Sequence, residues 1–318
     1  MPEYRSIAFL GLGHMGTPMA ANLVKAGHRV AGFDVVPAAR DAARAAGIPV
    51  SGSPREAVAG ADVVLTMFPS GEHVLAAYQG IDGEPGLLAA AAPGTVFLDC
   101  STINVAEARE AAALTGAAGH TFVDAPVSGG VAGAGAGTLT FMVGAPAAGF
   151  ADILPPLEVM GKRVVHCGDH GAGQAAKICN NLILGVSMIA VSEAFVLGEE
   201  LGLSHQALFD VASAASGQCW ALTTNCPVPG PVPGSPANRD YLPGFAGSLM
   251  AKDLNLAVNA LRSTGVAGRL GPLAAEIYDT FAAEGGASRD FSAIITDIRA
   301  RSEQERGAAP AHHDGSPE

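Results

Sequence analysis

The sequence predicts an α/β protein with a doubly wound, mostly parallel N-terminal sheet and an all-α C-terminal domain. Three observations support this fold class. Strand-like and helix-like segments alternate through the first half, a glycine-rich turn follows the first strand, and clear strand patterns stop near residue 165. A chain of 318 residues exceeds one ordinary core and suits two domains. We therefore expect domains at 1–165 and 166–301, and a disordered polar tail at 302–318.

The first half contains short apolar runs of the length that strands have. They predict strands within 6–13, 28–34, 61–69, 94–102, 120–130 and 139–146. Between the first two, residues 15–27 have apolar side chains at helical spacing, and Gly27 marks the end of that helix. This order of strand, helix and strand predicts a parallel, doubly wound sheet.

The second half reads as helices. Residues 172–201 form one long apolar pattern, about 45 Å at ~1.5 Å per residue, which we expect to bridge the two domains. Further amphipathic helices are predicted at 204–216, 247–265 and 271–285. The proline-rich segment 226–244 predicts an extended loop, and loops of that length in compact domains tend to be functional.

The composition limits the classes of partner. Hydrophobic residues make up 49% and charged residues 15%, which is typical of a globular protein, and the net charge of −12 disfavours nucleic acid as a partner. The apolar run that begins at Leu182 includes two serines and is followed by Glu193, so we expect a buried helix and no membrane span. Five cysteines without a CxxC pair, and an N-terminus without a signal-peptide pattern, predict a reduced, cytoplasmic protein.

A glycine-rich turn follows the first predicted strand. Gly11, Gly13 and Gly16 form G-x-G-x-x-G around Leu12, His14 and Met15, where a strand passes into a helix. The helix N-terminus offers unpaired N–H groups to a pyrophosphate. Asp34 ends the next strand and can accept hydrogen bonds from both ribose hydroxyls, which favours NAD over NADP. The first domain is therefore predicted to be a Rossmann-type, NAD-binding domain, although a glycine turn without a ligand remains an alternative.

Two later strand ends offer further cofactor contacts. Met67, Phe68 and Pro69 follow one strand, and Thr102 follows another. Ligands of doubly wound sheets bind beyond the carboxyl ends of the strands, so these residues are candidates to flank the cofactor. Taken alone, each is equally well explained as ordinary loop structure.

Lys177 is the single charged residue between Gly171 and Ser192. A lysine on an apolar helix is desolvated, which lowers its pKa and suits it to exchange protons near neutrality. Asn181 lies one turn further on the same face and can orient the lysine or a substrate hydroxyl. The competing interpretation is a lysine whose stem packs at a domain boundary while its ammonium group reaches water.

Two other segments are candidates for substrate or cofactor contacts. Ser128, Gly129 and Gly130 can present a hydroxyl and two backbone N–H groups in one concave turn, which suits a carboxylate. Lys252 and Asp253 lie on another largely apolar predicted helix, where Lys252 can reach cofactor or substrate and Asp253 can pair with a cation. A flexible turn and a solvated charge pair are the respective alternatives.

Together these segments resemble the β-hydroxyacid dehydrogenase family. The resemblance rests on four ordered motifs, FLGLGHMGTPMAANLVKAGH, DAPVSGGVAGAGAGTLTFMVG, GAGQAAKICNN and LMAKDLNLA, and covers residues 7 to about 301. Within the family, segment 217–245 is similar to one characteristic of 3-hydroxyisobutyrate dehydrogenases. His14, in place of a common asparagine, and Cys100, in place of a frequent serine, depart from the family pattern.

The resemblance implies an activity and roles. It implies NAD-dependent oxidation of (S)-3-hydroxyisobutyrate to methylmalonate semialdehyde, a step of valine catabolism, by a homodimer or homotetramer without a metal. Lys177 would be the general base and acid, Asn181 would support the substrate hydroxyl, residues 128–130 would hold the carboxylate, and Lys252 would lie at the cofactor. Two alternatives stay open: a sister NAD(P)-dependent reductase of another small 3-hydroxy acid or semialdehyde, such as tartronate semialdehyde or 3-hydroxypropionate, and a non-catalytic NAD-binding scaffold.

Overall fold

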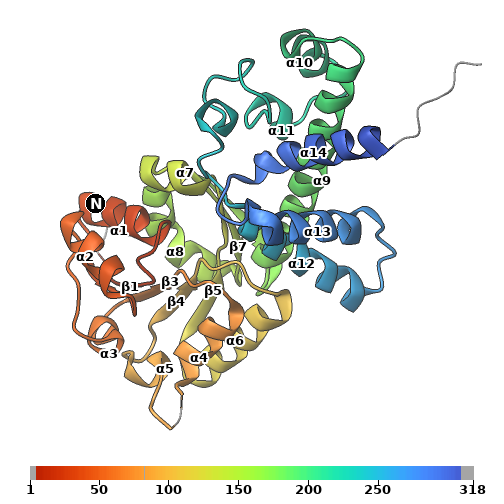
Figure 1. Cartoon of the computed structure of the whole chain (residues 1–318). Helices are drawn as coiled ribbons and strands as arrows, with labels where there is room; N and C mark the ends of the chain where they lie inside the picture. The colour runs from red at the N-terminus through yellow and green to blue at the C-terminus, as the bar shows by residue number, and fades with distance from the viewer. Residues whose placement is uncertain (1–4, 82, 309–318) are drawn as a thin grey trace, which may run out of the picture. The chain divides into compact units, whose positions relative to one another are not determined.

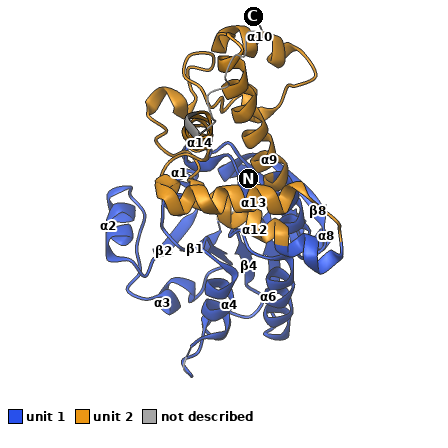
Figure 2. Cartoon of the chain, turned by 45° about the vertical axis from the view of Figure 1, so that its right-hand side comes forward, with its two compact units in different colours: residues 1–180, 259–265 blue, residues 181–258, 266–318 orange. Residues whose placement is uncertain are grey.

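The computed structural model describes residues 5–81 and 83–308, of which residues 307 and 308 are described by their backbone alone. The chain divides into two compact units (Figure 2). Unit 1 holds residues 1–180 and 259–265, and unit 2 holds residues 181–258 and 266–318. The division between Asn180 and Asn181 falls within one long helix, so Lys177 belongs to unit 1 and Asn181 to unit 2.

Unit 1 is built on a mixed, mostly parallel sheet, which confirms the predicted fold class (Figure 1). The described strands follow the order β2-β1-β3-β4-β5-β7-β6, and β8 pairs with β7. The first five strands are parallel, whereas β7 runs antiparallel to β5 and β6 and parallel to β8. The strands are β1 Ser6–Leu10, β2 Arg29–Phe33, β3 Val63–Thr66, β4 Val96–Asp99, β5 Thr121–Asp124, β6 Val127–Ser128, β7 Leu139–Gly144 and β8 Gly161–Gly168.

Helices cover both faces of this sheet because successive side chains of each strand point to opposite sides. Ile7 and Phe9 of β1 pack in one core with helices α1 and α8, whereas Ala8 and Leu10 pack in a second core with α3, α4 and α6. The helices of unit 1 are α1 Gly16–Lys25, α2 Pro37–Ala45, α3 Pro54–Val58, α4 Gly71–Gln79, α5 Leu87–Ala90, α6 Val105–Ala117, α7 Gly130–Ala136 and α8 Ala147–Met160.

Three elements of unit 1 had no clear sequence signal. Helix α7 forms in a run of small residues and ends at Gly137, which takes the left-handed conformation with φ of 65°. Helix α8 contains Pro155 and Pro156, although proline disfavours helix interiors. Strand β8 alternates poorly between buried and exposed side chains, so the two-residue period that identifies strands is weak.

Unit 2 is helical throughout its described elements, as predicted. The long apolar pattern forms one helix, α9 Ala172–Glu200, whose first turns lie in unit 1. The other elements are α10 His205–Ala214, α11 Trp220–Thr223, η1 Pro236–Arg239, α12 Gly247–Thr264, α13 Leu270–Phe281, η2 Ala282–Gly286, η3 Phe291–Ala293 and α14 Ile294–Ala308. Helix α9 is long and apolar enough to cross a membrane, but core helices of soluble proteins meet the same criterion.

The proline-rich loop of unit 2 is tied down by hydrogen bonds to its own backbone and to Asp290. Ser235 donates to the Cys226 carbonyl (2.7 Å), and the Tyr241 hydroxyl donates to the Pro227 carbonyl (2.8 Å). Buried Asp290 accepts from the backbone N–H groups of Gly244 and Phe245, where the loop ends. Loop 226–244 is therefore a packed part of unit 2.

The polar tail begins later than residue 302. Helix α14 continues to Ala308, and Ser302 and Arg306 lie inside it. Arg301 pairs with Asp297 one turn earlier, and Arg306 pairs with Glu200 of α9, so polar side chains stabilise a helix that composition alone did not predict. The remainder of the predicted tail, residues 309–318, lies outside the described residues.

Candidate active site

The glycine turn after β1 has a shape that only glycine permits. Gly11 has a φ of 96°, and a Cβ there would overlap the backbone carbonyl of Met67 in the loop after β3. A Cβ at Gly16 would overlap the Gly11 carbonyl, so these two glycines serve close packing. At Gly13, in contrast, a Cβ would meet no protein atom within 4 Å. Packing does not require that glycine, whereas the close approach of a pyrophosphate would.

Asp34 lies directly after β2 and is half-buried. Its carboxylate accepts hydrogen bonds from the backbone N–H groups of Leu12 (2.7 Å) and Val36 (2.8 Å). The acid is thereby joined to the glycine turn. Arg40 donates to the Asp34 backbone carbonyl and lies over the Phe33 ring, so a guanidinium group stands close to this strand end.

The loops after β3 and β4 are joined by Ser101. Its hydroxyl donates to Asp99 (2.6 Å) and accepts from the backbone N–H of Phe68 (2.8 Å). Strand order reverses between β1 and β3, and in doubly wound sheets ligands bind at such a reversal, beyond the carboxyl ends of the strands. The structure thus brings the loop with Met67, Phe68 and Pro69 beside the glycine turn and ties it to the loop that carries Thr102.

Residues 128–130 form a tight turn of the backbone. Ser128 ends the short strand β6 opposite Thr140, and Gly129 and Gly130 have φ values of 130° and 60°. Positive φ at two successive positions favours glycine and turns the backbone sharply. Ser128 is half-buried and Gly129 is exposed, so the turn is accessible to a ligand. Its role as a carboxylate site stays a prediction.

Helix α9 begins against a buried carboxylate. Asp124, at the end of β5, accepts hydrogen bonds from the backbone N–H groups of Gly171 (2.7 Å) and Gln174 (3.0 Å). Burial raises the pKa of Asp124 to about 6, the charge of Asp99 adds to that increase, and the two backbone donors oppose it. Lys177 follows in the same helix with 6% of its surface exposed, so the lysine singled out in the sequence is buried.

The remaining predicted residues lie in unit 2. Asn181 is buried and donates from its side-chain amide to Asp253 of α12, a contact that the sequence did not predict. Lys252 is half-buried on the same helix. The roles of Asn181 at the substrate hydroxyl and of Lys252 at the cofactor stay predictions.

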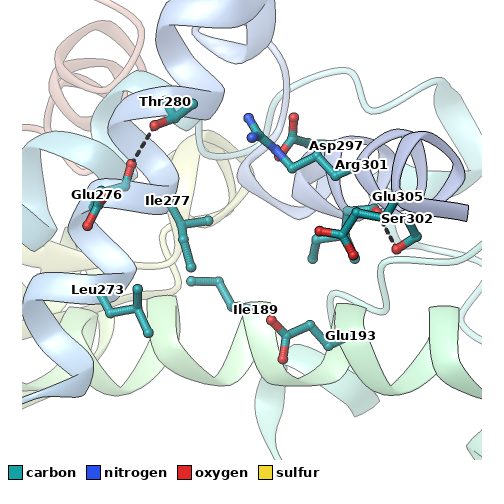
Figure 3. Close-up of a pocket in the computed structure, with 11 residues that line it drawn as sticks. Ile189, Glu193, Leu273, Glu276, Ile277, Thr280, Asp297, Arg301, Ser302 and Glu305 are labelled. Atoms are coloured by element: carbon teal, nitrogen blue, oxygen red, sulfur yellow. Dashed lines mark hydrogen bonds and ion pairs between the residues drawn. The ribbon is translucent and has the colours of Figure 1, made fainter. Parts of the chain in front are cut away.

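A pocket of about 320 Å³ in unit 2 contains none of the predicted site residues (Figure 3). Its lining is Ile189, Glu193, Leu273, Glu276, Ile277, Thr280, Asp297, Ile298, Arg301, Ser302 and Glu305. Four of these are acids, and its one arginine is paired with Asp297 (2.7 Å). Such a lining repels a carboxylate. Within residues 5–81 and 83–308, no cluster of three or more His, Cys, Asp or Glu side chains is placed to hold a metal ion.

Two buried polar residues, Asp124 at the end of β5 and Gln174 in the first turn of α9, were overlooked in the sequence. Asp124 and Gln174 are fully buried, and both stand in segments, DAPVSGG and GAGQAAK, that otherwise consist largely of small or apolar residues. A polar residue in such a segment is the signal that could have identified them, since buried polar groups need partners.

Comparison with known proteins agrees with this geometry. Residues 6–168 match the family model described as the NAD binding domain of 6-phosphogluconate dehydrogenase. Residues 171–298 match the model described as NAD-binding of NADP-dependent 3-hydroxyisobutyrate dehydrogenase.

Individual relatives are similar over nearly the whole chain. A probable 3-hydroxyisobutyrate dehydrogenase of Mycobacterium tuberculosis is 56% identical over 298 residues, 94% of this chain and 99% of the relative. An NAD-dependent L-serine dehydrogenase of Pseudomonas aeruginosa is 47% identical over 290 residues, 91% and 96% of the two chains. A solved structure of Mycobacterium tuberculosis 3-hydroxyisobutyrate dehydrogenase with L-serine has a TM-score of 0.88 and 55% identity, and covers 93% of this chain and 100% of that one.

The glycine turn, Asp34 and the matched domains define an oxidoreductase that binds an NAD-type cofactor. The chain belongs to the β-hydroxyacid dehydrogenase family, and its similarity is to the 3-hydroxyisobutyrate dehydrogenases within it.

Proposed function

We propose that this protein oxidises (S)-3-hydroxyisobutyrate to methylmalonate semialdehyde with NAD, as a step of valine catabolism. The single observation that carries the chemistry is the buried Lys177, with Asn181 one turn later on the same helix. The names of the relatives support the substrate. A scaffold that only binds NAD has no use for a buried lysine at this position.

The roles of the residues follow from the chemistry of the substrate. The cofactor accepts the hydride from C3 when bound. The Lys177 side chain is buried, and its amine would accept the proton that leaves the substrate hydroxyl and return it in the reverse reaction. Asn181 orients that hydroxyl. The turn at residues 128–130 holds the carboxylate and thereby fixes which carbon faces the cofactor.

L-serine is a second candidate substrate. A relative at 47% identity is named an L-serine dehydrogenase, and the solved structure at 55% identity is titled with L-serine. L-serine carries an ammonium group where 3-hydroxyisobutyrate carries a methyl group at C2, and the two share the carboxylate and the primary alcohol. The same lysine, asparagine and carboxylate turn would serve both, so discrimination depends on what surrounds C2.

Steady-state kinetics would test the substrate and the lysine together. The panel is 3-hydroxyisobutyrate, L-serine, 3-hydroxypropionate and glycerate, each with NAD and with NADP. We expect the highest kcat/KM for 3-hydroxyisobutyrate with NAD. Lys177→Ala should lower kcat by ~10²–10⁴-fold or more and leave NADH binding intact. Lys162→Ala, which removes an exposed lysine of β8, is the matched control and should leave kcat unchanged.

Two results would contradict the proposal separately. Another acid with a tenfold higher kcat/KM would overturn the substrate. Wild-type turnover in Lys177→Ala would overturn the role of the lysine while leaving the substrate assignment standing.

Three further expectations stay predictions. These are a homodimer or homotetramer, a cytoplasmic location, and the absence of membrane and nucleic-acid partners. Unit 2 carries apolar side chains that are largely exposed within this chain, and a second copy could cover them: Leu197, Leu201, Val211, Trp220 and Leu242.

A further inference from the structure

A buried hydrogen-bond network in unit 1 centres on Gln174, in the first turn of α9. Its side-chain amide bonds the loop after β4 at two points: Nε2 donates to the Ser101 carbonyl (2.8 Å), and Oε1 accepts from the Ile103 backbone N–H (3.1 Å). Gln174 is 0% exposed. The two bonds lie on either side of Thr102, the residue predicted to face the cofactor, so this one side chain fixes both ends of that short segment.

The backbone of the first turn of α9 is held by Asp124 at the end of β5. Asp124 accepts from the N–H groups of Gly171 and Gln174, and a Cβ at Gly173 would overlap the Met142 carbonyl and lie 2.8 Å from the Asp124 carboxylate. The start of α9 is therefore pressed against strands β5 and β7. A shift of the helix along its axis would break the bonds to Asp124 or force the backbones into overlap.

The network also reaches the loop after β3. Ser101, whose carbonyl binds Gln174, accepts through its hydroxyl from the Phe68 N–H and donates to Asp99. Both loops that are predicted to flank the cofactor are thus joined, through Ser101, to the helix that carries Lys177.

Lys177 follows Gln174 by three residues. That spacing places the two side chains on the same side of the helix, about 4.5 Å apart along its axis. A rotation of α9 that moved Lys177 would also pull Gln174 away from Ser101 and Ile103. We propose that Gln174 is a positioning residue that fixes the proton-accepting Lys177 relative to Thr102 and the cofactor loops. This inference rests on the proposed role of Lys177.

If Gln174 contributed only to stability, its loss would lower the stability of the fold and leave kcat unchanged. Two buried hydrogen bonds stabilise a fold by ~1 kcal/mol each, wherever they lie. Thr95, at the opposite end of β4, provides the matched control, because its hydroxyl lies 3.2 Å and 2.7 Å from the carbonyls of Ala61 and Ala92. Thr95→Val removes this one donor, whose proton the two carbonyls share, and leaves the network intact.

The test compares Gln174→Met with Thr95→Val. Methionine keeps the length of the glutamine side chain and cannot make either bond. We expect kcat of Gln174→Met to fall by ~10–100-fold, because small misplacements of catalytic groups have effects of that size, while NADH binding is unchanged. Thr95→Val should have a comparable loss of thermal stability and a wild-type kcat. Equal effects of the two variants on kcat, or a wild-type kcat in Gln174→Met, would overturn the inference.

A second variant uses pH as the readout. In Gln174→Glu, only the protonated form of the new carboxyl can donate to Ser101 and accept from Ile103 as the amide does. The ratio of its kcat to that of the wild-type protein should rise as pH falls, whereas the ratio for Gln174→Met should stay flat. A ratio for Gln174→Glu that does not change with pH would contradict the inference.

Hydrogen exchange separates this inference from the substrate assignment. The Ile103 amide should exchange roughly tenfold faster in Gln174→Met than in the wild-type protein and in Thr95→Val. That measurement needs no substrate. An inactive wild-type protein would contradict the proposed function alone, whereas unchanged exchange at Ile103 would contradict the bonding role of Gln174 alone.

Discussion

The two ends of helix α9 are held by different kinds of interaction. The N-terminal turn is held by Asp124 and Gln174, both fully buried, through bonds to backbone groups. Near the C-terminal end, Glu199 pairs with Arg299 and His205, and the Glu199 and Arg299 side chains are 28% and 30% exposed.

The two kinds of interaction restrain the helix to different degrees. Ion pairs that water can reach contribute little and tolerate movement of long side chains. Buried bonds to the backbone restrain the position of a helix more strongly, because any shift leaves polar groups without partners. Lys177, the proposed proton acceptor, lies one turn from these buried bonds, in the more tightly held part of the helix.

One substitution made at both ends should show the largest contrast. In Gly173→Ala, the added Cβ would overlap the Met142 carbonyl, a backbone atom that cannot move aside. We expect a loss of more than ~3 kcal/mol in the free energy of unfolding, the upper range for overpacked cores. At Gly198, the added Cβ would lie 3.0 Å from the end of the flexible Leu208 side chain, so Gly198→Ala should be neutral or stabilise the helix by up to ~1 kcal/mol.

Urea titrations of both variants measure the contrast. Equal losses at the two positions would show that the ends of the helix are equally constrained, and the comparison would then be wrong.

The second effect depends on pH. Burial raises the pKa of Asp124 to about 6 from a usual value of 3.8, so between these two pH values the folded state holds a proton that the unfolded chain has lost. The stability due to this group is therefore complete below pH 4 and is lost as pH rises through 6. The change amounts to roughly 2–3 kcal/mol at ~1.4 kcal/mol per pKa unit.

Asp124→Asn should abolish this part of the pH profile. The difference in free energy of unfolding between the wild-type protein and the variant should fall between pH 4 and 7. Asp152→Asn, at an exposed position of α8, is the control and should give a flat difference. If the difference in free energy of unfolding for Asp124→Asn is also independent of pH, burial does not raise the pKa of Asp124.

The sequence predicted unit 1 well because its signals are local. Gly11, Gly13 and Gly16 stand at fixed spacing after an apolar run, and each strand of the parallel sheet is a short apolar segment between turns. The long apolar pattern beginning at Ala172 likewise predicted α9 to within a residue. Helix α7 was not predicted because glycine-rich segments rarely form helices. Helix α14 was not predicted because the ion pair between Arg306 and Glu200 joins residues far apart in the sequence.

The network around Gln174 could not be predicted for a similar reason. Lys177 was recognised because a single charge in an apolar helix requires an explanation. Gln174 is uncharged, and its partners Ser101 and Ile103 lie more than seventy residues earlier in the chain. Such pairs become visible only when the fold brings a helix start to the end of a strand.

The smallest effect is expected at the C-terminal end of α9. The Arg299 guanidinium, through its hydrogen bond, holds the pKa of Glu199 below its usual value. Because the pair is partly exposed, Arg299→Met should cost less than ~1 kcal/mol and leave kcat unchanged. The loss should nearly vanish in about 1 M salt, where charges are screened within ~3 Å. Urea titrations at low and high salt measure this, with Gln174→Met, which removes buried bonds of an uncharged side chain, as the salt-insensitive reference. A loss that persists in high salt would mean that this end, too, is held mainly by packing and hydrogen bonds that salt does not screen.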